Sequence, residues 1–199
     1  MPQAIGIREQ SVAATVHAVV RAARDVLSDP EPGTWSMEAV ALAAGVTRAT
    51  VYNHFRSRTD LIEAVLDTVV ARDRMDRLVE VSADADPVVA LRQAVARTCR
   101  FWHAERPLLR RLFATAYADA SVEALLRRRE GWRREQLAVL LGRVGGVPSR
   151  AAARTRADVL LALTSFPTYD RLAGSTDGPG RTATTLNQLV SALLAGAHA

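Results

Sequence analysis

The chain has 199 residues and a formal net charge of +5, with 49% hydrophobic and 24% charged residues. This composition is typical of a soluble globular protein with one or two modest domains, and it excludes an intrinsically disordered chain. All 26 basic residues are arginine, and a moderate positive charge favours nucleic acid or another anion as partner without selecting one.

Cellular location is predicted from what the sequence lacks. It has no run of about eighteen apolar residues and no signal peptide pattern at its start. The single cysteine, Cys99, cannot form an intramolecular disulfide, and we interpret it as a small buried hydrophobe rather than a redox sensor. These features predict a cytoplasmic protein with no membrane partner.

An apolar stripe predicts the first helix. Its members recur at helical spacing: Val16, Val19, Val20, Ala23, Val26 and Leu27. The segment DPEPG at positions 29–33 then ends the helix, because two prolines and a glycine disfavour helical backbone.

Two short helices joined by a tight turn are predicted next. Ser36 is a favourable N-cap residue, and Glu38 lies in the first turn. One face of this helix is apolar: Met37, Val40, Ala41 and Ala44. Gly45 can adopt a left-handed conformation cheaply, and Thr47 can cap a following helix that runs through Phe55. The result is a helix, a glycine turn and a second helix.

The second of these helices carries polar residues where a core helix would be apolar. Val51 and Phe55 lie four residues apart and can anchor it, while Thr50 and Asn53 project away from them. No acidic residue occurs between positions 38 and 60, an interval that contains Arg48, Arg56 and Arg58. The local charge therefore suits a polyanion such as the phosphate backbone of DNA.

The segment VALAAGVTRATVYNHFRSRTDLI, starting at position 40, resembles the helix-turn-helix of the TetR family of bacterial transcriptional regulators. The matching residues are Ala43, Ala44, Gly45, Val46, Tyr52, His54, Phe55 and Leu61. The resemblance covers about residues 12–65, because VVRAARDVL at 19–27 is similar to the family's first helix. It implies a homodimer that represses, less often activates, nearby genes and leaves double-stranded operator DNA when a small ligand binds.

The resemblance also implies roles for individual residues. Five side chains are expected to contact backbone phosphates: Thr47, Thr50, Tyr52, His54 and Arg58, the last where the family more often has lysine. Arg48 and Asn53 are expected at base edges, because a guanidinium matches guanine and a carboxamide matches adenine. Ala49 departs from the glycine or proline often found there, and its role stays open. Tyr52 could instead be a core aromatic, His54 a solvated surface residue, and Thr47 a helix cap alone.

The rest of the chain is predicted to be helical throughout. Ser57 and Asp60 start a long fourth helix that extends toward Val81, and the polar stretch at 82–87 ends it. Five helical patterns follow: 87–103, 107–117, 121–141, 149–172, interrupted or kinked at Pro167, and 181–194. We therefore predict an all-α chain with a helix-turn-helix domain at 1–56, a connecting helix at 57–81 and a helical-bundle effector and dimerisation domain at 82–199.

The C-terminal bundle is expected to provide two interfaces. Apolar residues of the last two helices could form a four-helix dimer interface or pack within the chain: Val159, Leu160, Leu163, Leu186, Leu189, Val190, Leu193 and Leu194. Candidates for an effector pocket, each of which could equally be core, are Trp102, His103, Phe113, Tyr117, Trp132, Phe166 and Tyr169. The arginines of the 127–134 run are interpreted as a solvated helix face.

Catalysis is the competing class of function. The sequence has no P-loop, no strand-flanked dinucleotide motif and no nucleophile elbow, and its histidines lack metal-ligand spacing. We therefore predict no enzyme, no cofactor and no metal. A second alternative is a helical ligand-binding or scaffold protein of the same fold that does not bind specific DNA sequences.

Overall fold

The computed structural model describes residues 3–29, 35–81, 86–144, 150–174 and 178–195, and within these residues it contains helices and no strand. The predicted all-α class is confirmed. The chain folds as two compact units, Met1–Val69 with Pro107–Leu125, and Val70–Arg106 with Leu126–Ala199. None of the described helices combines the length and the apolarity needed to cross a membrane.

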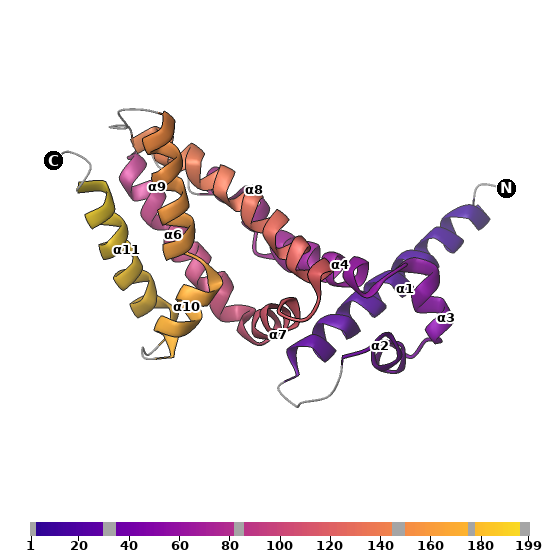
Figure 1. Ribbon diagram of the computed structural model, residues 1–199. Helices are drawn as coiled ribbons and strands as arrows, with labels where there is room; N and C mark the ends of the chain where they lie inside the picture. Colours follow the sequence, from indigo (N-terminus) through magenta and orange to yellow (C-terminus); the bar gives the residue numbers. More distant parts are fainter. Residues whose placement is uncertain (1–2, 30–34, 82–85, 145–149, 175–177, 196–199) are drawn as a thin grey trace. The chain divides into compact units, whose positions relative to one another are not determined.

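The first unit is built around the N-terminal helices (Figure 1). Its elements are α1 (Gln3–Ser28), α2 (Met37–Ala44), α3 (Arg48–His54), most of α4 (Arg58–Arg72), α7 (Arg106–Ala116) and the start of α8 (Ala120–Val144). Helix α2 packs against both α1 and α3. The predicted stripe of α1 faces this core, where Val19, Ala23 and Leu27 are fully buried.

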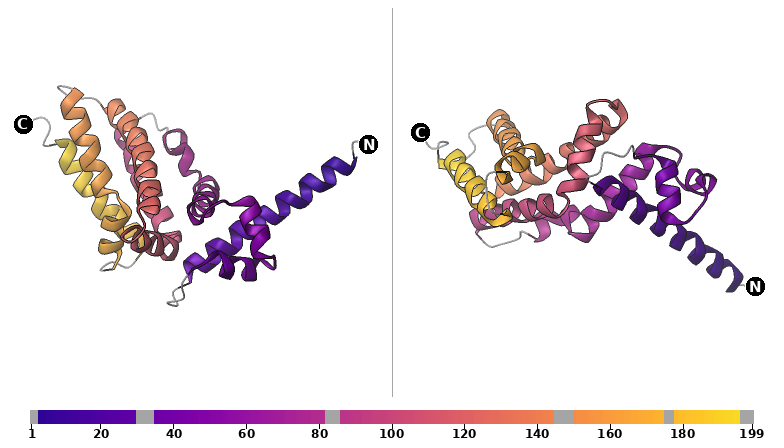
Figure 2. Two further views of the ribbon diagram at one scale, coloured as in Figure 1. Left: turned by 45° about the vertical axis from the view of Figure 1, so that its right-hand side comes forward. Right: turned by 90° about the horizontal axis from the view of Figure 1, so that it is seen from below.

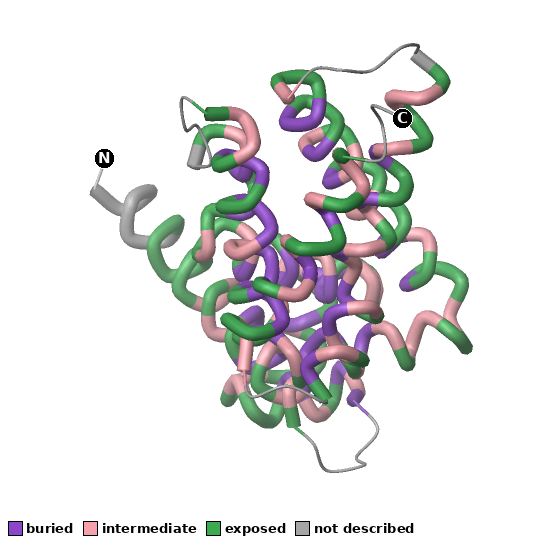
Figure 3. Tube along the Cα trace, turned by 90° about the vertical axis from the view of Figure 1, so that its left-hand side faces the viewer, coloured by how far each residue is buried: buried purple, intermediate pink, exposed green. Residues whose placement is uncertain are grey.

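The second unit is a bundle of longer helices. It contains the end of α4, the short helices η1 (Met75–Arg77) and α5 (Leu78–Val81), α6 (Pro87–Ala104), the rest of α8, α9 (Arg150–Leu163), α10 (Phe166–Ala173) and α11 (Pro179–Ala195). Helices α6 and α11 lie side by side along most of their length (Figures 1 and 2). Buried and exposed residues alternate around these helices, as expected for helices that pack on one face (Figure 3).

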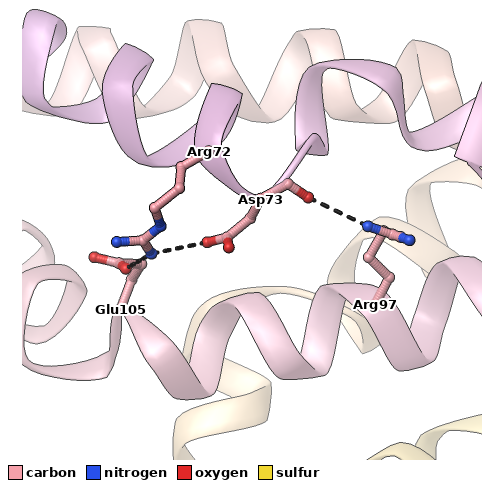
Figure 4. Close-up of polar contacts among 4 residues, drawn as sticks. All are labelled: Arg72, Asp73, Arg97 and Glu105. Carbon is pink, nitrogen blue, oxygen red and sulfur yellow. Dashed lines mark hydrogen bonds and ion pairs between the residues drawn. The ribbon is translucent and has the colours of Figure 1, made fainter.

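The predicted fourth helix is shorter than its apolar pattern suggested. Helix α4 ends at Arg72 rather than near Val81, and Arg74 adopts a left-handed conformation with φ of 54°. The Arg72 guanidinium forms ion pairs with Asp73, at 3.0 Å, and with the buried Glu105 (Figure 4). Arg97 of α6 donates a 3.3 Å hydrogen bond to the Asp73 carbonyl. Polar partners on α6 and after it thus stabilise the end of α4, where local periodicity alone would continue the helix.

The interruption predicted at Pro167 is confirmed. Helix α9 ends at Leu163 and α10 begins at Phe166, with Pro167 in its first turn. Ser165 is the N-cap of α10, and its hydroxyl accepts a 3.4 Å hydrogen bond from the Thr168 amide. The division into domains at positions 56 and 81 stays a prediction, and the compact units include residues 107–125 with the N-terminal helices.

Candidate nucleic-acid interface

The turn between α2 and α3 has the geometry that its sequence predicts. The Ser36 hydroxyl accepts a 3.1 Å hydrogen bond from the Ala39 amide at the start of α2. Gly45 has φ of 67°, and the next amide, that of Val46, donates a 3.0 Å hydrogen bond to the Ala41 carbonyl. This pairing satisfies a carbonyl that the end of the helix would otherwise leave free. A left-handed residue is required here, which explains the glycine.

Helix α3 is held by one face and presents the other. Val51 is fully buried and Phe55 is 7% exposed, so both anchoring roles are confirmed. The Thr47 hydroxyl caps the helix by accepting a 3.1 Å hydrogen bond from the Thr50 amide. Asn53 is exposed and Thr50 is partly exposed, so neither is enclosed by the core.

The remaining predicted DNA contacts are also at the surface. Tyr52 is 40% exposed, which argues against a purely core role for this aromatic ring. Thr47, Arg48 and Arg58 are exposed, and His54 is partly exposed. Every side chain that the sequence assigned to DNA is therefore exposed or partly exposed, and all of them belong to the first unit. Their individual contacts remain predictions.

Arg48 has partners that the sequence did not reveal. Its guanidinium lies 2.7 Å from the Glu38 carboxylate and 5.2 Å from the centroid of the Tyr52 ring. The interaction with Tyr52, followed by the charge of Glu38, raises the pKa of Arg48. Glu38 lies on the preceding helix, and sequence spacing cannot show which side chains face each other across a turn. We therefore add Glu38 to the candidate interface.

Arg58, at the start of α4, is positioned by an aromatic ring. Its guanidinium lies over the ring of Trp35, 4.9 Å from the centroid. Trp35 itself is 5% exposed, and its buried indole nitrogen has no hydrogen-bond partner in the described part of the chain. A cation held over an indole face is attracted by the ring quadrupole. Trp35 therefore fixes the direction from which Arg58 approaches solvent, a role that the sequence analysis missed.

The seven predicted effector residues are divided between the two compact units. Four of them cluster in the second unit, where the Trp102 and Phe166 rings lie 5.9 Å apart and His103 is within 3.1 Å of the Tyr169 hydroxyl. Phe166 and Tyr169 are buried at 3% and 0% exposure, as core residues would be. Phe113 and Tyr117 belong to the first unit, and Tyr117 is 95% exposed. Trp132 is 37% exposed.

Arg133 corrects the interpretation of the arginine run as a solvated face. Arg127 and Arg128 are exposed, but Arg133 is only 6% exposed. Its guanidinium donates to the Thr164 carbonyl at 2.8 Å, to the Thr164 hydroxyl at 3.1 Å and to the Leu161 carbonyl at 3.2 Å. Burial lowers the pKa of Arg133 to about 10. It satisfies carbonyls at the end of α9, so its role in the structure is to hold the break before α10.

Helices α8 and α9 border a groove of about 490 Å³. Its lining residues are Arg134, Glu135, Ala138, Leu141, Gly142, Ala153, Arg154, Arg156 and Ala157. None of the predicted effector residues is among them. Within the described residues, no group of three or more His, Cys, Asp and Glu side chains is arranged to hold a metal ion.

Comparison with known proteins connects this surface to a family. Residues 19–65 match the family model described as bacterial regulatory proteins, tetR family. No curated protein matches the sequence.

Solved structures resemble the chain over most of its length. A transcriptional regulator from Rhodococcus sp. Rha1 is 24% identical with a TM-score of 0.71, covering 91% of this chain and 96% of that chain. NalD of Pseudomonas aeruginosa, the secondary repressor of the MexAB-OprM multidrug efflux pump, is 21% identical with a TM-score of 0.70, covering 90% and 96%. At these identities the likeness shows the fold. Residues 19–65 therefore match the N-terminal domain of the TetR family, and the chain as a whole has the fold of transcriptional regulators of that family.

Proposed function

We propose that this chain is a ligand-responsive repressor that binds a palindromic operator as a homodimer and leaves it when a small molecule binds. The observation that carries the proposal is the presentation of α3: Val51 and the C-cap residue Phe55 are buried, while Asn53 and Arg48 are exposed. A polar helix held in this way can enter the major groove of DNA. The family and the fold are those of transcriptional regulators rather than of enzymes.

The proposed contacts divide into two groups. Thr47, Thr50, Tyr52, His54 and Arg58 bind backbone phosphates and set the position of the helix without reading sequence. Arg48 and Asn53 read base edges, since their planar groups can form paired hydrogen bonds with guanine and adenine. Their exposure and their common location on the first unit support this assignment.

Dimerisation is proposed to occur through α9 to α11. Leu160, Leu186 and Val190 are buried within the chain, so they serve its own core. Val159 and Leu189 remain 38% and 44% exposed, and these two side chains are available for a second copy. A dimer is needed because two reading helices must reach successive major-groove segments of a palindromic site.

The effector is proposed to bind among the helices of the second unit. A ligand that prefers one arrangement of this unit would change the pose of α4, which begins in the first unit and ends in the second. The separation of the two reading helices would change with it, and operator affinity would fall by the difference in ligand affinity between the two states. Equal separation in ligand-bound and free crystal structures would contradict this mechanism.

Recovery and sequencing of the genomic fragments that bind the purified protein would test the proposal. The wild type is expected to enrich particular fragments and to shift them in a gel. Arg48→Gln should weaken that binding about 10- to 100-fold, the effect of losing a paired contact to a base. Tyr52→Phe should weaken it less, because the lost phosphate contact leaves base reading intact. Absence of binding to any genomic fragment would favour the scaffold alternative.

A further inference from the structure

A carboxylate lies directly against the arginine that is proposed to read bases. Glu38 is in the first turn of α2 and Arg48 is the first residue of α3, and their charged groups are 2.7 Å apart. Both helices start at side-chain caps, Ser36 and Thr47, and the left-handed Gly45 joins them. The distance between the two side chains is therefore set by well-defined backbone at both ends.

A second group holds Arg48 from another side. The guanidinium lies over the Tyr52 ring, at 5.2 Å from its centroid, and Tyr52 is on the same helix four residues later. The Arg48 and Glu38 side chains are still 62% and 53% exposed, so DNA has access to both. An ion pair this exposed contributes little to folding. Its main consequence is the charge that α3 presents to DNA.

We propose that Glu38 is a specificity-determining residue, which neutralises Arg48 toward phosphates and releases it only when a base edge replaces the carboxylate. This inference rests on the proposed function, because it requires Arg48 to contact DNA. Glu38 acts through Arg48 and so is a positioning residue.

The two kinds of DNA should respond differently to loss of the Glu38 charge. Binding to random sequence depends on how many phosphates the protein neutralises and falls steeply with salt. Removal of the carboxylate frees Arg48 for a phosphate, so random DNA should be bound more tightly. At a selected site the guanidinium already has guanine O6 and N7 as acceptors, and that contact does not need Glu38. The ratio of specific to non-specific affinity should therefore fall.

The test compares wild type with Glu38→Gln by fluorescence anisotropy. One probe is a short duplex of random sequence, and the other is a duplex selected by the wild type from a random pool. Glu38→Gln should bind the random duplex several-fold more tightly. Its plot of log affinity against log salt should be steeper by about 0.9 for each chain that gains a phosphate contact. Affinity for the selected duplex should change less.

Three variants separate this effect from a general change of charge or fold. Glu135→Gln removes one exposed negative charge from α8, outside α2 and α3, and should leave the salt slope unchanged. Glu38→Asp keeps the charge and should retain most of the discrimination. In an Arg48→Gln background, Glu38→Gln should have no further effect on either duplex, because the partner is already absent.

Distinct outcomes would overturn the inference or its premise. If Glu38→Gln and Glu135→Gln changed DNA binding equally, the change in net charge alone would explain the effect, and the inference would be overturned. Loss of affinity for the selected duplex alone would show that Glu38 contacts DNA itself, which also overturns it. Failure of the wild type to select any sequence would instead overturn the proposed function, and the inference with it.

Discussion

At the residue scale, Arg133 shows how a buried charge can serve structure. Its guanidinium binds three oxygens of Leu161 and Thr164 at the break between α9 and α10. Trp102 adds to the same cluster, because its ring faces the guanidinium at 5.3 Å and its indole nitrogen donates to the Thr164 carbonyl at 2.9 Å. The cluster therefore connects α6, α8 and the end of α9.

Arg133→Met should lower the free energy of unfolding by about 3 kcal/mol, because it keeps a similar volume but removes the guanidinium hydrogen bonds to the Leu161 carbonyl and the Thr164 hydroxyl, and leaves the Thr164 carbonyl with Trp102 as donor. Urea denaturation followed by circular dichroism would measure the loss. Arg134→Met is the matched control, since Arg134 forms an exposed pair with Asp158 at 2.6 Å and its removal should cost less than about 1 kcal/mol. Equal losses would contradict the structural role of Arg133.

Cys99 behaves as the buried hydrophobe that the sequence predicted. It is 1% exposed, and burial raises the pKa of its thiol from 9.0 to about 12. The unfolded thiol loses its proton near pH 9, so the unfolded state binds fewer protons between pH 9 and 12. This contribution to stability is complete below pH 9 and is lost as the pH rises toward 12.

The wild type should therefore lose about 1.4 kcal/mol more unfolding free energy than Cys99→Ala between pH ~8 and ~10. Denaturation curves at the two pH values would measure the difference. Subtracting the loss seen in Cys99→Ala removes the contribution of every other titrating group, because the two proteins share those groups. Parallel losses in both proteins would show that the thiol titrates alike in the folded and unfolded states.

At the element scale, the helix-turn-helix depends on one glycine whose backbone is left-handed. A Cβ added at Gly45 would meet no atom within 4 Å, so the cost of a side chain there comes from φ of 67° alone. Gly131 in α8 has equal space and no positive φ. The two positions therefore separate backbone strain from crowding.

Gly45→Ala should destabilise the chain by about 1 kcal/mol, since a left-handed conformation is unfavourable for alanine. Gly131→Ala should stabilise it by about 0.5–1 kcal/mol, because alanine loses less backbone freedom in a helix. Thermal unfolding of both variants against wild type would show opposite shifts. A stabilising Gly45→Ala would mean that the turn is not left-handed in solution.

At the scale of the whole molecule, the proposed dimer depends on apolar side chains that the chain leaves exposed. Val159 on α9 and Leu189 on α11 are such residues, and Val139 on α8 is a third, at 51% exposure, outside the helices proposed to meet a second copy. Charges introduced at the first two positions would have to be desolvated in a helix-to-helix interface.

A Val159→Arg, Leu189→Arg double variant should sediment as a monomer and lose most of its affinity for a palindromic duplex. Val139→Arg should remain a dimer and bind DNA like wild type. Analytical ultracentrifugation would measure both. A double variant that stays dimeric with unchanged helical content would place the interface elsewhere.

The helical class, the first helix, the turn at Gly45 and the two anchors of α3 were all predictable from sequence, because capping, glycine conformation and apolar periodicity act over a few neighbouring residues. The end of α4 at Arg72, the burial of Arg133 and the pairing of Glu38 with Arg48 were decided only by tertiary structure. Each depends on a partner from another helix, and the spacing of residues along the sequence does not predict which side chains of different helices come into contact. The candidate DNA surface is thus largely local in origin, whereas its charge balance and the end of α4 are not.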